Sequence, residues 1–477
     1  MQNRSEIENM DKIWLFCTKK RTHSCDFFYL WNPGDLCYTV HDWRLARQET
    51  ARGLHTGKPG NRFDGIFPGP GARTEGPDCM QARGTGRTGP INAYYAVYYI
   101  KQNEWRMSKM TPKKIAVLGG GNGAHTMAAE MTLKGHTVTL YEMPKFRQNM
   151  KEVFETKTIN LKGNIPELQG PVKLHNVTDD IAEAVEDAHY ICLVTPAFAH
   201  LDYAKLLKGH VHKDQIIVTF PGAFAALVLK NVLGDEDCPL LADANNLPYD
   251  SRLVAKGSNT VNVFGRNPIN IAFLPAEKAP EYIDEMREDL FPFEKIYTDV
   301  LECGLAIVNP DWHAGPVLFN ISNIESPHVT FYLYEMGWTP SACRLNIAMD
   351  KERKAIGDVL GYNLRPMEDF AGRPADYKWT WQDLYKEGHG SIGLTPICGP
   401  NDITSRYLTE DVPYGLVPWA AIAEVIGVPM PLTNGFIDII NVVHEKDWRK
   451  EGCGLDELGI AGMDKDTLLK YVRTGKR

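Results

Sequence analysis

The stretch from Lys114 to Glu142 restricts the fold of this chain more than any other. It opens with the apolar run Ile115 to Leu118, continues as Gly-Gly-Gly-Asn-Gly-Ala, passes through a segment of helical pattern, and ends with a second apolar run and an acid. Four consecutive apolar residues are typical of a parallel strand that is buried on both faces. Strand, glycine turn, helix, strand and acid together form the dinucleotide-binding fingerprint, in the order that it requires.

Each small residue of this turn has a physical role. Gly119 allows the tight turn out of the strand, and Gly121, which lacks a Cβ, lets the backbone approach a pyrophosphate. Ala124 lets the helix lie close to the sheet, and Asn122 and Gly123 complete the turn between them. Free N–H groups at the helix start attract phosphate oxygens. We therefore predict that all five residues belong to a cofactor-binding site.

Glu142 decides which dinucleotide is expected. It lies 21 residues after Gly121, where a carboxylate can accept hydrogen bonds from ribose hydroxyls and would repel a 2′-phosphate. The sequence therefore favours NAD(H) over NADP(H), although Lys145 and Arg147 follow closely and weaken that preference. His125, within the turn, is expected either to contact the cofactor or to cap the helix.

The alternation of strands and helices continues to about residue 300, which predicts a doubly wound parallel sheet of the Rossmann type. Residues 190–194 form a strong buried strand, so Thr195 and Pro196 are expected at the carboxyl edge of the sheet, where a cofactor lies. Helical periodicity then takes over. We predict a Rossmann domain at 107–300 and a mostly α-helical domain at 301–477, with a cleft between them for the second substrate.

Local patterns add finer expectations. Residues 159–161 and 172–174 predict short strands of a small insertion, and residues 261–264 and 269–273 predict a late hairpin. Residues 329–336 are expected to be helical.

Composition excludes several classes of protein. A net charge of −8 gives no reason to expect nucleic-acid binding, and no apolar run is long enough to predict a membrane-spanning helix. Ten scattered cysteines without a C-x-x-C pattern are expected to be reduced thiols of a cytoplasmic protein. No metal site is predicted, because the H-x-H at His210 and His212 has no third ligand nearby. A homodimer is left open.

Residues 1–106 differ from the rest of the chain. They carry 15 basic against 11 acidic residues, and residues 53–89 are rich in Gly, Pro and Arg without an apolar period. Such a stretch should not form a packed unit. Our hypothesis is that this segment is a poorly structured or spurious extension and that the protein starts at Met107 or Met110. A disordered regulatory arm and a targeting peptide are the alternatives, and mass spectrometry of the native protein separates them.

Two segments of the second domain carry residues suited to chemistry. His313 lies three residues before Pro316, which suits the first turn of a helix, so His313 is expected just ahead of a helix start. A histidine is the usual proton carrier near neutral pH. Arg406 can hold a carboxylate with two hydrogen bonds, and Asp411 can fix the tautomer of a histidine. The competing interpretations are a packed histidine and a helix-terminal salt bridge.

Residues 113 to about 450 resemble the octopine/nopaline (opine) dehydrogenase family. The resemblance is carried by Gly-Gly-Gly-Asn-Gly-Ala-His from Gly119, by Asn309 with His-Ala-Gly-Pro from His313, and by Arg406 with Glu-Asp-Val-Pro-Tyr-Gly from Glu410. It implies a Rossmann domain joined to an α-helical domain. It also implies that His313 is the catalytic histidine, that Asp411 is its acidic partner, and that Arg406 binds a keto acid.

The implied activity is that of an NAD(P)-dependent oxidoreductase acting on CH–NH donors. An amino acid and an α-keto acid would condense to an imine, which is then reduced to a secondary-amine dicarboxylate. Two alternatives stay open. A related 2-keto or hydroxy acid reductase would need no amine, and a dinucleotide-sensing protein would bind NADH without consuming it.

Overall fold

The computed structural model describes residues 111–477 apart from 327–329, 368, 370–376, 391–393 and 396, together with the backbone of three strands nearer the N-terminus. These strands are β1 (Trp14–Cys17), β2 (Phe28–Asn32) and β3 (Asp35–Val40), and they form an antiparallel sheet within the compact unit Met1–Thr88. Gly89–Arg477 is the second compact unit. Most of residues 1–106 lies outside the described residues, so the hypothesis of an added extension stays a prediction.

The first domain of the second unit is built on a seven-stranded sheet in the order β14-β11-β10-β9-β4-β5-β8. Within it, β14 is antiparallel to β11 and the other neighbours are parallel. The strands are β4 (Lys114–Leu118), β5 (Thr137–Tyr141), β8 (Asn176–Thr178), β9 (Tyr190–Leu193), β10 (Ile216–Thr219), β11 (Leu240–Ala244) and β14 (Ile271–Leu274). This is the doubly wound sheet that the sequence predicts.

Alternate residues of β4 show how the two faces of the sheet are covered. Ile115 and Val117 pack in one buried cluster with helix α2 (Asn122–Leu133), whereas Ala116 and Leu118 pack in the cluster on the other face. The helices of the domain other than α2 are α3 (Lys151–Thr156), α4 (Ile181–Val185), α5 (His200–Leu207), α6 (Ala225–Leu233) and α7 (Ala279–Asp289). Each fully buried aliphatic side chain of such a strand contributes about 1.5–3 kcal/mol, which explains the uninterrupted apolar run.

A smaller four-stranded sheet has the order β12-β13-β6-β7. Its strands are β6 (Thr158–Gly163), β7 (Gly170–Lys173), β12 (Tyr249–Leu253) and β13 (Thr260–Arg266). The predicted insertion strands are confirmed as β6 and β7, but the predicted hairpin is wrong, because β13 pairs with β12 and β14 joins the large sheet. Burial explains the difference: all four residues of β14 are buried, whereas burial along β13 alternates at its start.

The second domain is helical, as predicted. Its helices are α8 (Val300–Leu305), α9 (Asn309–Leu318), α10 (Ile321–Ile324), α11 (Pro340–Leu360), α12 (Trp381–Gly388), α13 (Arg406–Thr409), α14 (Val417–Ile426), α15 (Pro431–His444) and α16 (Trp448–Glu451). The predicted helix at 329–336 is wrong in its described part, where Tyr332 instead makes an isolated bridge with Cys398. The buried cluster on one face of the large sheet continues into this domain, so the two domains share a core.

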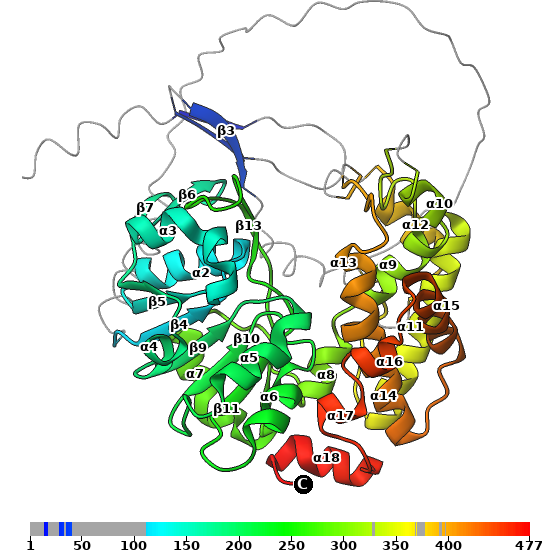
Figure 1. Ribbon diagram of the computed structural model, residues 1–477. Helices are drawn as coiled ribbons and strands as arrows, with labels where there is room; N and C mark the ends of the chain where they lie inside the picture. Colours follow the sequence, from blue (N-terminus) through cyan, green and yellow to red (C-terminus); the bar gives the residue numbers. More distant parts are fainter. Residues whose placement is uncertain are drawn as a thin grey trace, which may run out of the picture. The chain divides into compact units, whose positions relative to one another are not determined.

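The end of the chain returns to the first domain. Helix α17 (Leu455–Leu458) packs against α6, and α18 (Lys465–Thr474) lies against β14 (Figure 1). The Asn231 side chain of α6 donates to the carbonyl of Asp456 at 2.9 Å and accepts from Arg477 at 2.9 Å. The two domains are therefore connected both before α8 and before α17. No helix among the described residues is long and apolar enough to cross a membrane.

Candidate active site

The glycine turn has the geometry of a pyrophosphate site. Gly119 has a φ of +121°, and a Cβ there would lie 2.5 Å from the carbonyl oxygen of Val194, so this position needs glycine. Around Gly121 the opposite holds, because no atom lies within 4 Å of the place that its Cβ would take. Gly121 precedes the first residue of α2 and no side chain caps that helix start. Open space beside uncapped N–H groups fits a bound phosphate.

The next three residues pack the turn against the rest of the first domain. The Asn122 side-chain oxygen accepts from the backbone N–H of Leu253 at 2.9 Å, which ties β12 to the turn. A Cβ on Gly123 would lie 2.7 Å from the Leu247 side chain, and Ala124 is fully buried. Gly123 and Ala124 therefore have only backbone N–H groups to offer a cofactor, whereas Asn122 also keeps its side-chain amide donors.

The acid at the end of β5 lies beside this turn. The Glu142 carboxylate accepts from the backbone N–H of Met143 at 2.8 Å and from the Tyr203 hydroxyl at 3.3 Å. Burial raises its pKa, and these hydrogen bonds oppose the rise. The two basic residues that could attract a 2′-phosphate both lie near acids: Arg147 donates to Asp179 at 2.6 Å, and Lys145 lies 3.5 Å from Asp202. The surroundings of Glu142 thus suit a cofactor ribose that carries no 2′-phosphate.

The loop after β9 faces the same turn. The Thr195 hydroxyl is buried without a hydrogen-bond partner among the described residues, and such a group costs about 1–3 kcal/mol unless a ligand satisfies it. A polar group of a bound cofactor would supply the missing hydrogen bond. Behind the turn, burial lowers the pKa of His125 and of His200 to about 4, so both rings are neutral. His125 Nδ1 lies 2.9 Å from the Gly121 carbonyl oxygen, within the first turn of α2.

His313 lies inside helix α9, not ahead of it. Pro310 takes the first turn, whereas Pro316 lies inside the helix, so the predicted helix start is wrong. A proline within a helix removes the N–H that its preceding turn needs. Here the Trp312 carbonyl, which would have accepted that N–H, accepts from the Trp338 indole at 3.0 Å and from the Asn346 amide at 3.1 Å. Two side chains thus replace the missing donor.

The His313 ring is held at both nitrogens. Its Nδ1 lies 2.5 Å from the Asp411 carboxylate, and its Nε2 lies 3.3 Å from the Tyr334 hydroxyl. The Tyr407 ring packs edge-on against the imidazole at a centroid distance of 4.5 Å. His313 is 7% exposed, so its ring is mostly enclosed. A carboxylate at Nδ1 orients the imidazole and stabilises its protonated form.

Asp411 owes its position to an irregular helical segment. Helix α13 runs into a π-helical turn, Val412–Leu416, which leads into α14; such turns are frequent at functional sites. Burial raises the pKa of Asp411, and His313 opposes that rise. The pair therefore forms a largely enclosed acid–base unit whose two members come from separate helical segments.

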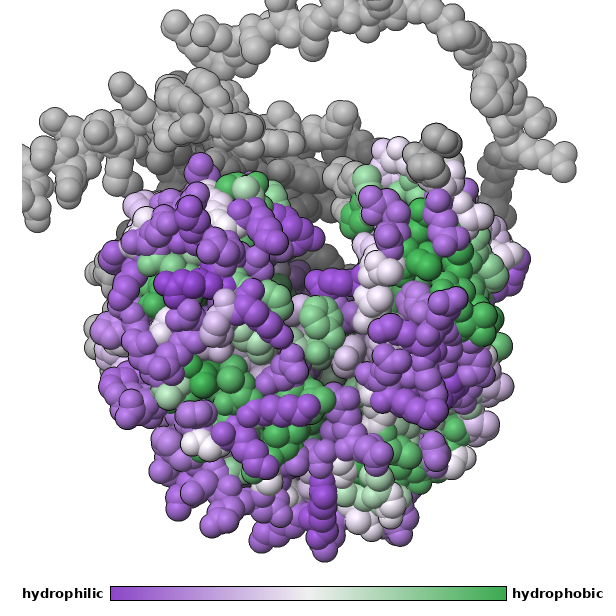
Figure 2. Space-filling view, viewed as in Figure 1, coloured by the Kyte–Doolittle hydropathy of each residue, from purple (hydrophilic) through white to green (hydrophobic). Residues whose placement is uncertain are grey.

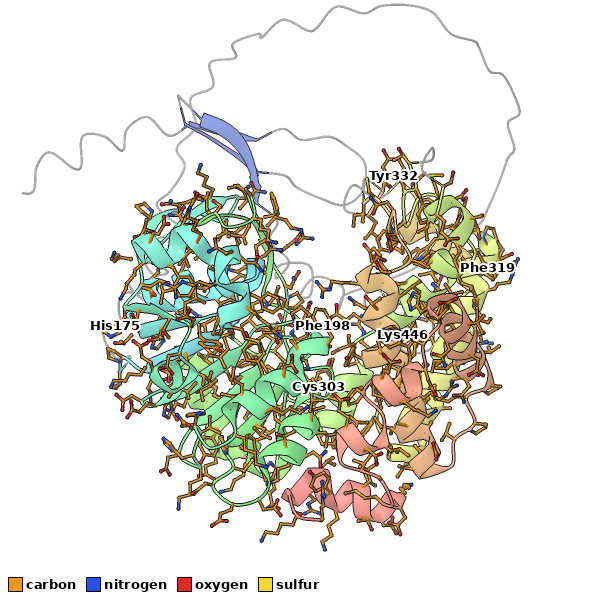
Figure 3. The ribbon with its side chains drawn as sticks, viewed as in Figure 1. His175, Phe198, Cys303, Phe319, Tyr332 and Lys446 are labelled. Atoms are coloured by element: carbon orange, nitrogen blue, oxygen red, sulfur yellow. The ribbon has the colours of Figure 1, made fainter. Side chains whose placement is uncertain are left out.

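Arg406 lies one turn ahead of Asp411. Its side chain is 68% exposed, and its Nε donates to the Glu410 carboxylate. The other Glu410 oxygen accepts from the backbone N–H of Ala197 at 2.9 Å, in the loop after Thr195 and Pro196. The neighbouring Phe198 lies on the edge of the first domain that faces the helical domain (Figure 3). Cofactor-side and catalytic segments thus meet at Glu410.

These contacts bring part of the predicted site together, because Glu410 joins the loop after Thr195 to the segment that carries Arg406 and Asp411. Figure 2 shows the two domains in contact below and separated by a hollow above. The glycine turn and Thr195 come from one domain, and His313, Asp411 and Arg406 come from the other. No group of three or more His, Cys, Asp or Glu side chains suited to a metal ion occurs in the part of the chain that the structure describes.

Three contact residues had no signal in the sequence. Tyr334 lies in an irregular segment, and Tyr407 carries no pattern that separates it from an ordinary core tyrosine. Arg252 of β12 also acts here: burial and Asp411 raise the pKa of Tyr407, and the charges of Arg252 and Arg406 oppose that rise. Only distances between segments could reveal these neighbours.

Comparison with known proteins agrees with this geometry. Residues 296–444 match the family described as NAD/NADP octopine/nopaline dehydrogenase, alpha-helical domain, and residues 114–227 match the NAD-dependent glycerol-3-phosphate dehydrogenase N-terminus. The opine dehydrogenase of Arthrobacter sp. (strain 1C) is 32% identical over 359 residues, which cover 74% of this chain and 96% of that protein. The chain belongs to the opine dehydrogenase family.

More distant relatives share the same plan. The octopine dehydrogenase of Pecten maximus is 24% identical over 410 residues, which cover 74% of this chain and 94% of that protein. The solved structure of octopine dehydrogenase with NADH and pyruvate has a TM-score of 0.61 at 19% identity, and covers 76% of this chain and 98% of that one. This opine dehydrogenase homologue is an NAD-dependent oxidoreductase with small-molecule substrates, as the sequence predicted.

Proposed function

We propose that this protein condenses an amino acid with an α-keto acid and reduces the resulting imine to a secondary-amine dicarboxylate. The observation that carries the proposal is the His313–Asp411 pair, whose Nδ1 and carboxylate oxygen lie 2.5 Å apart, next to Glu410, which contacts the loop on the cofactor side at Ala197. Family membership supports the same reaction. A buried histidine with a carboxylate behind it is suited to proton transfer at the carbinolamine and imine stages.

The chain's own residues divide the remaining work. Gly119, Gly121 and the start of α2 would bind the pyrophosphate of NADH, Glu142 its ribose, and Thr195 with Pro196 the part nearest the reaction. When bound, NADH supplies the hydride for the imine carbon. His313 would exchange the proton at Nε2, with Asp411 holding Nδ1–H. Arg406 would bind the keto-acid carboxylate and orient the imine.

A screen of NADH oxidation over α-keto acids crossed with amino acids tests the reaction. We expect consumption of NADH only when both partners are present, and mass spectrometry should show one product whose mass is that of the reduced imine. Oxidation with a keto acid alone would identify a simple keto-acid reductase instead. Tight NADH binding without consumption in any combination would identify a dinucleotide-sensing protein.

Two coarser expectations complete the proposal. We infer residence in the cytoplasm from the cysteine pattern, which fluorescence localisation of the tagged native chain would test. The homodimer stays an open prediction, which light scattering of the purified protein would decide.

A further inference from the structure

Glu410 makes the contact that joins the two halves of the site. Its Oε1 accepts from the Ala197 N–H at 2.9 Å in the first domain, and its Oε2 accepts from Arg406 Nε in the second. Its side chain is only 15% exposed, whereas that of Arg406 is 68% exposed. One partly buried carboxylate therefore holds both the loop beside the cofactor turn and the long side chain of Arg406.

The way in which Arg406 is held has a consequence for ligand binding. Its Nε is engaged, whereas its two terminal nitrogens have no hydrogen-bond partner among the described residues. An arginine binds a carboxylate with two parallel N–H donors, and the terminal pair has the required spacing. Fixing a long side chain costs up to about 2 kcal/mol of conformational entropy, so an arginine that is already held by Glu410 loses less on binding.

We propose that Glu410 is a positioning residue, which holds Arg406 ready for the keto-acid carboxylate and couples it to the Thr195–Ala197 loop. The inference rests on the proposed function and adds a residue to which no chemical step is assigned. It explains why two acids stand side by side here: Asp411 serves His313, and Glu410 serves Arg406.

Two substitutions separate the two contacts of Glu410. Glu410→Gln keeps an oxygen for the Ala197 N–H but presents no charge to Arg406, whereas Glu410→Ala loses both. We expect E410Q to raise the KM for the keto acid about tenfold, equal to about 1.4 kcal/mol, with kcat and the Kd for NADH within about twofold of wild type. E410A should raise that KM equally and also lower kcat, because the cofactor-side loop is released.

The matched control is Asp438→Asn, which removes the 2.5 Å pair between Arg449 and Asp438 on the surface of the same domain. It should leave the keto-acid KM and kcat unchanged. A double-mutant cycle with Arg406→Lys completes the test, because residues that act together give non-additive changes. The loss on adding E410Q to R406K should be much smaller than the loss that E410Q causes in wild type.

Several outcomes overturn the proposal. An unchanged keto-acid KM in E410Q would leave Glu410 a structural residue, and additive effects in the cycle would separate it from Arg406. A lower KM in E410Q would mean that Glu410 competes with the substrate for Arg406. Keto-acid affinity is also measured without turnover, by titrating pyruvate into the protein–NADH complex and following NADH fluorescence. If wild type binds pyruvate but does not oxidise NADH with any amine, the proposed condensation reaction is contradicted. The role of Glu410 in pyruvate binding can still be tested by the titration.

Discussion

The two halves of the active site are built in different ways. The cofactor turn uses neighbouring residues, from Gly119 to Ala124, and its geometry follows from one strand, one turn and one helix. The catalytic pair joins His313 and Asp411, which are 98 residues apart, and depends on how α9 packs against α13. The first half is a local property of the chain, and the second is a property of the fold. Substitutions should therefore damage the two halves in different ways.

The largest expected effect is on the catalytic pair. His313→Ala should lower kcat by a factor of about 100 or more, because it removes the proton carrier, and should leave the Kd for NADH within about twofold. Stopped-flow kinetics and a fluorescence titration measure the two quantities. Unchanged turnover would remove His313 from the mechanism, and a large loss of NADH affinity would mean that the two halves are not separable.

Next comes a matched pair within the turn. Gly119→Ala should reduce the free energy of unfolding by about 2–4 kcal/mol, because φ is +121° and the new Cβ meets a backbone oxygen at 2.5 Å. Gly121→Val should leave stability nearly unchanged but raise the Kd for NADH about tenfold or more, because its side chain enters open space reserved for the pyrophosphate. Denaturant unfolding and NADH titration of both variants check this. If both variants changed stability and NADH affinity to the same extent, the open space beside Gly121 would not be the pyrophosphate site.

A smaller effect is expected at Tyr334. Tyr334→Phe removes the hydroxyl that lies 3.3 Å from His313 Nε2 and should lower kcat by a factor of about 3–10, since neutral hydrogen bonds contribute about 0.5–1.5 kcal/mol. Steady-state kinetics give the value, and Tyr362→Phe, which removes a hydroxyl that donates to Asp299 instead of contacting His313, serves as the control. A loss as large as that of H313A would make Tyr334 itself a proton carrier.

The smallest effect on activity is expected at Asp243, which the chemistry does not use. Burial raises the pKa of Asp243 to about 7, so its proton is bound more tightly in the folded state than in the unfolded state. The contribution of this proton to the free energy of unfolding is therefore fully present below about pH 4. It is lost as the pH rises through about 7. Relative to Asp243→Asn, wild type should lose about 3 kcal/mol of unfolding free energy between pH 5 and pH 8. If the unfolding free energies of wild type and Asp243→Asn changed with pH in the same way, this prediction would be contradicted.

The same contrast explains what could be predicted from the sequence. The succession of strands and helices in the first domain, the glycine turn and the helical character of the second domain followed from local patterns, because apolar runs and periodicity report burial directly. The place of β14 did not, since pairing with β11 depends on a partner 27 or more residues away in the chain. The helix around Pro316 was missed for the same reason: the donors that replace its N–H, Trp338 and Asn346, come from distant segments.

For the site, motif and resemblance named the reactive residues but not their neighbours. His313, Asp411 and Arg406 carry recognisable chemistry, and their roles stay proposals that the variants above test. Glu410 was visible as one letter of a motif, and its spacing of four residues from Arg406 suits an ion pair along a helix. Its contact with Ala197 appears only in the fold, because no sequence pattern links residues 213 positions apart.

The return of the chain's end to the first domain limits how the hollow can change shape. One link runs from α7 to α8, and the other from α16 to α17, which packs against α6. Together with the shared core, this second link restrains a rotation of the helical domain against the first domain. Ending the chain at Gly454, before α17, would remove the second link and leave the shared core and the link from α7 to α8 as the restraints.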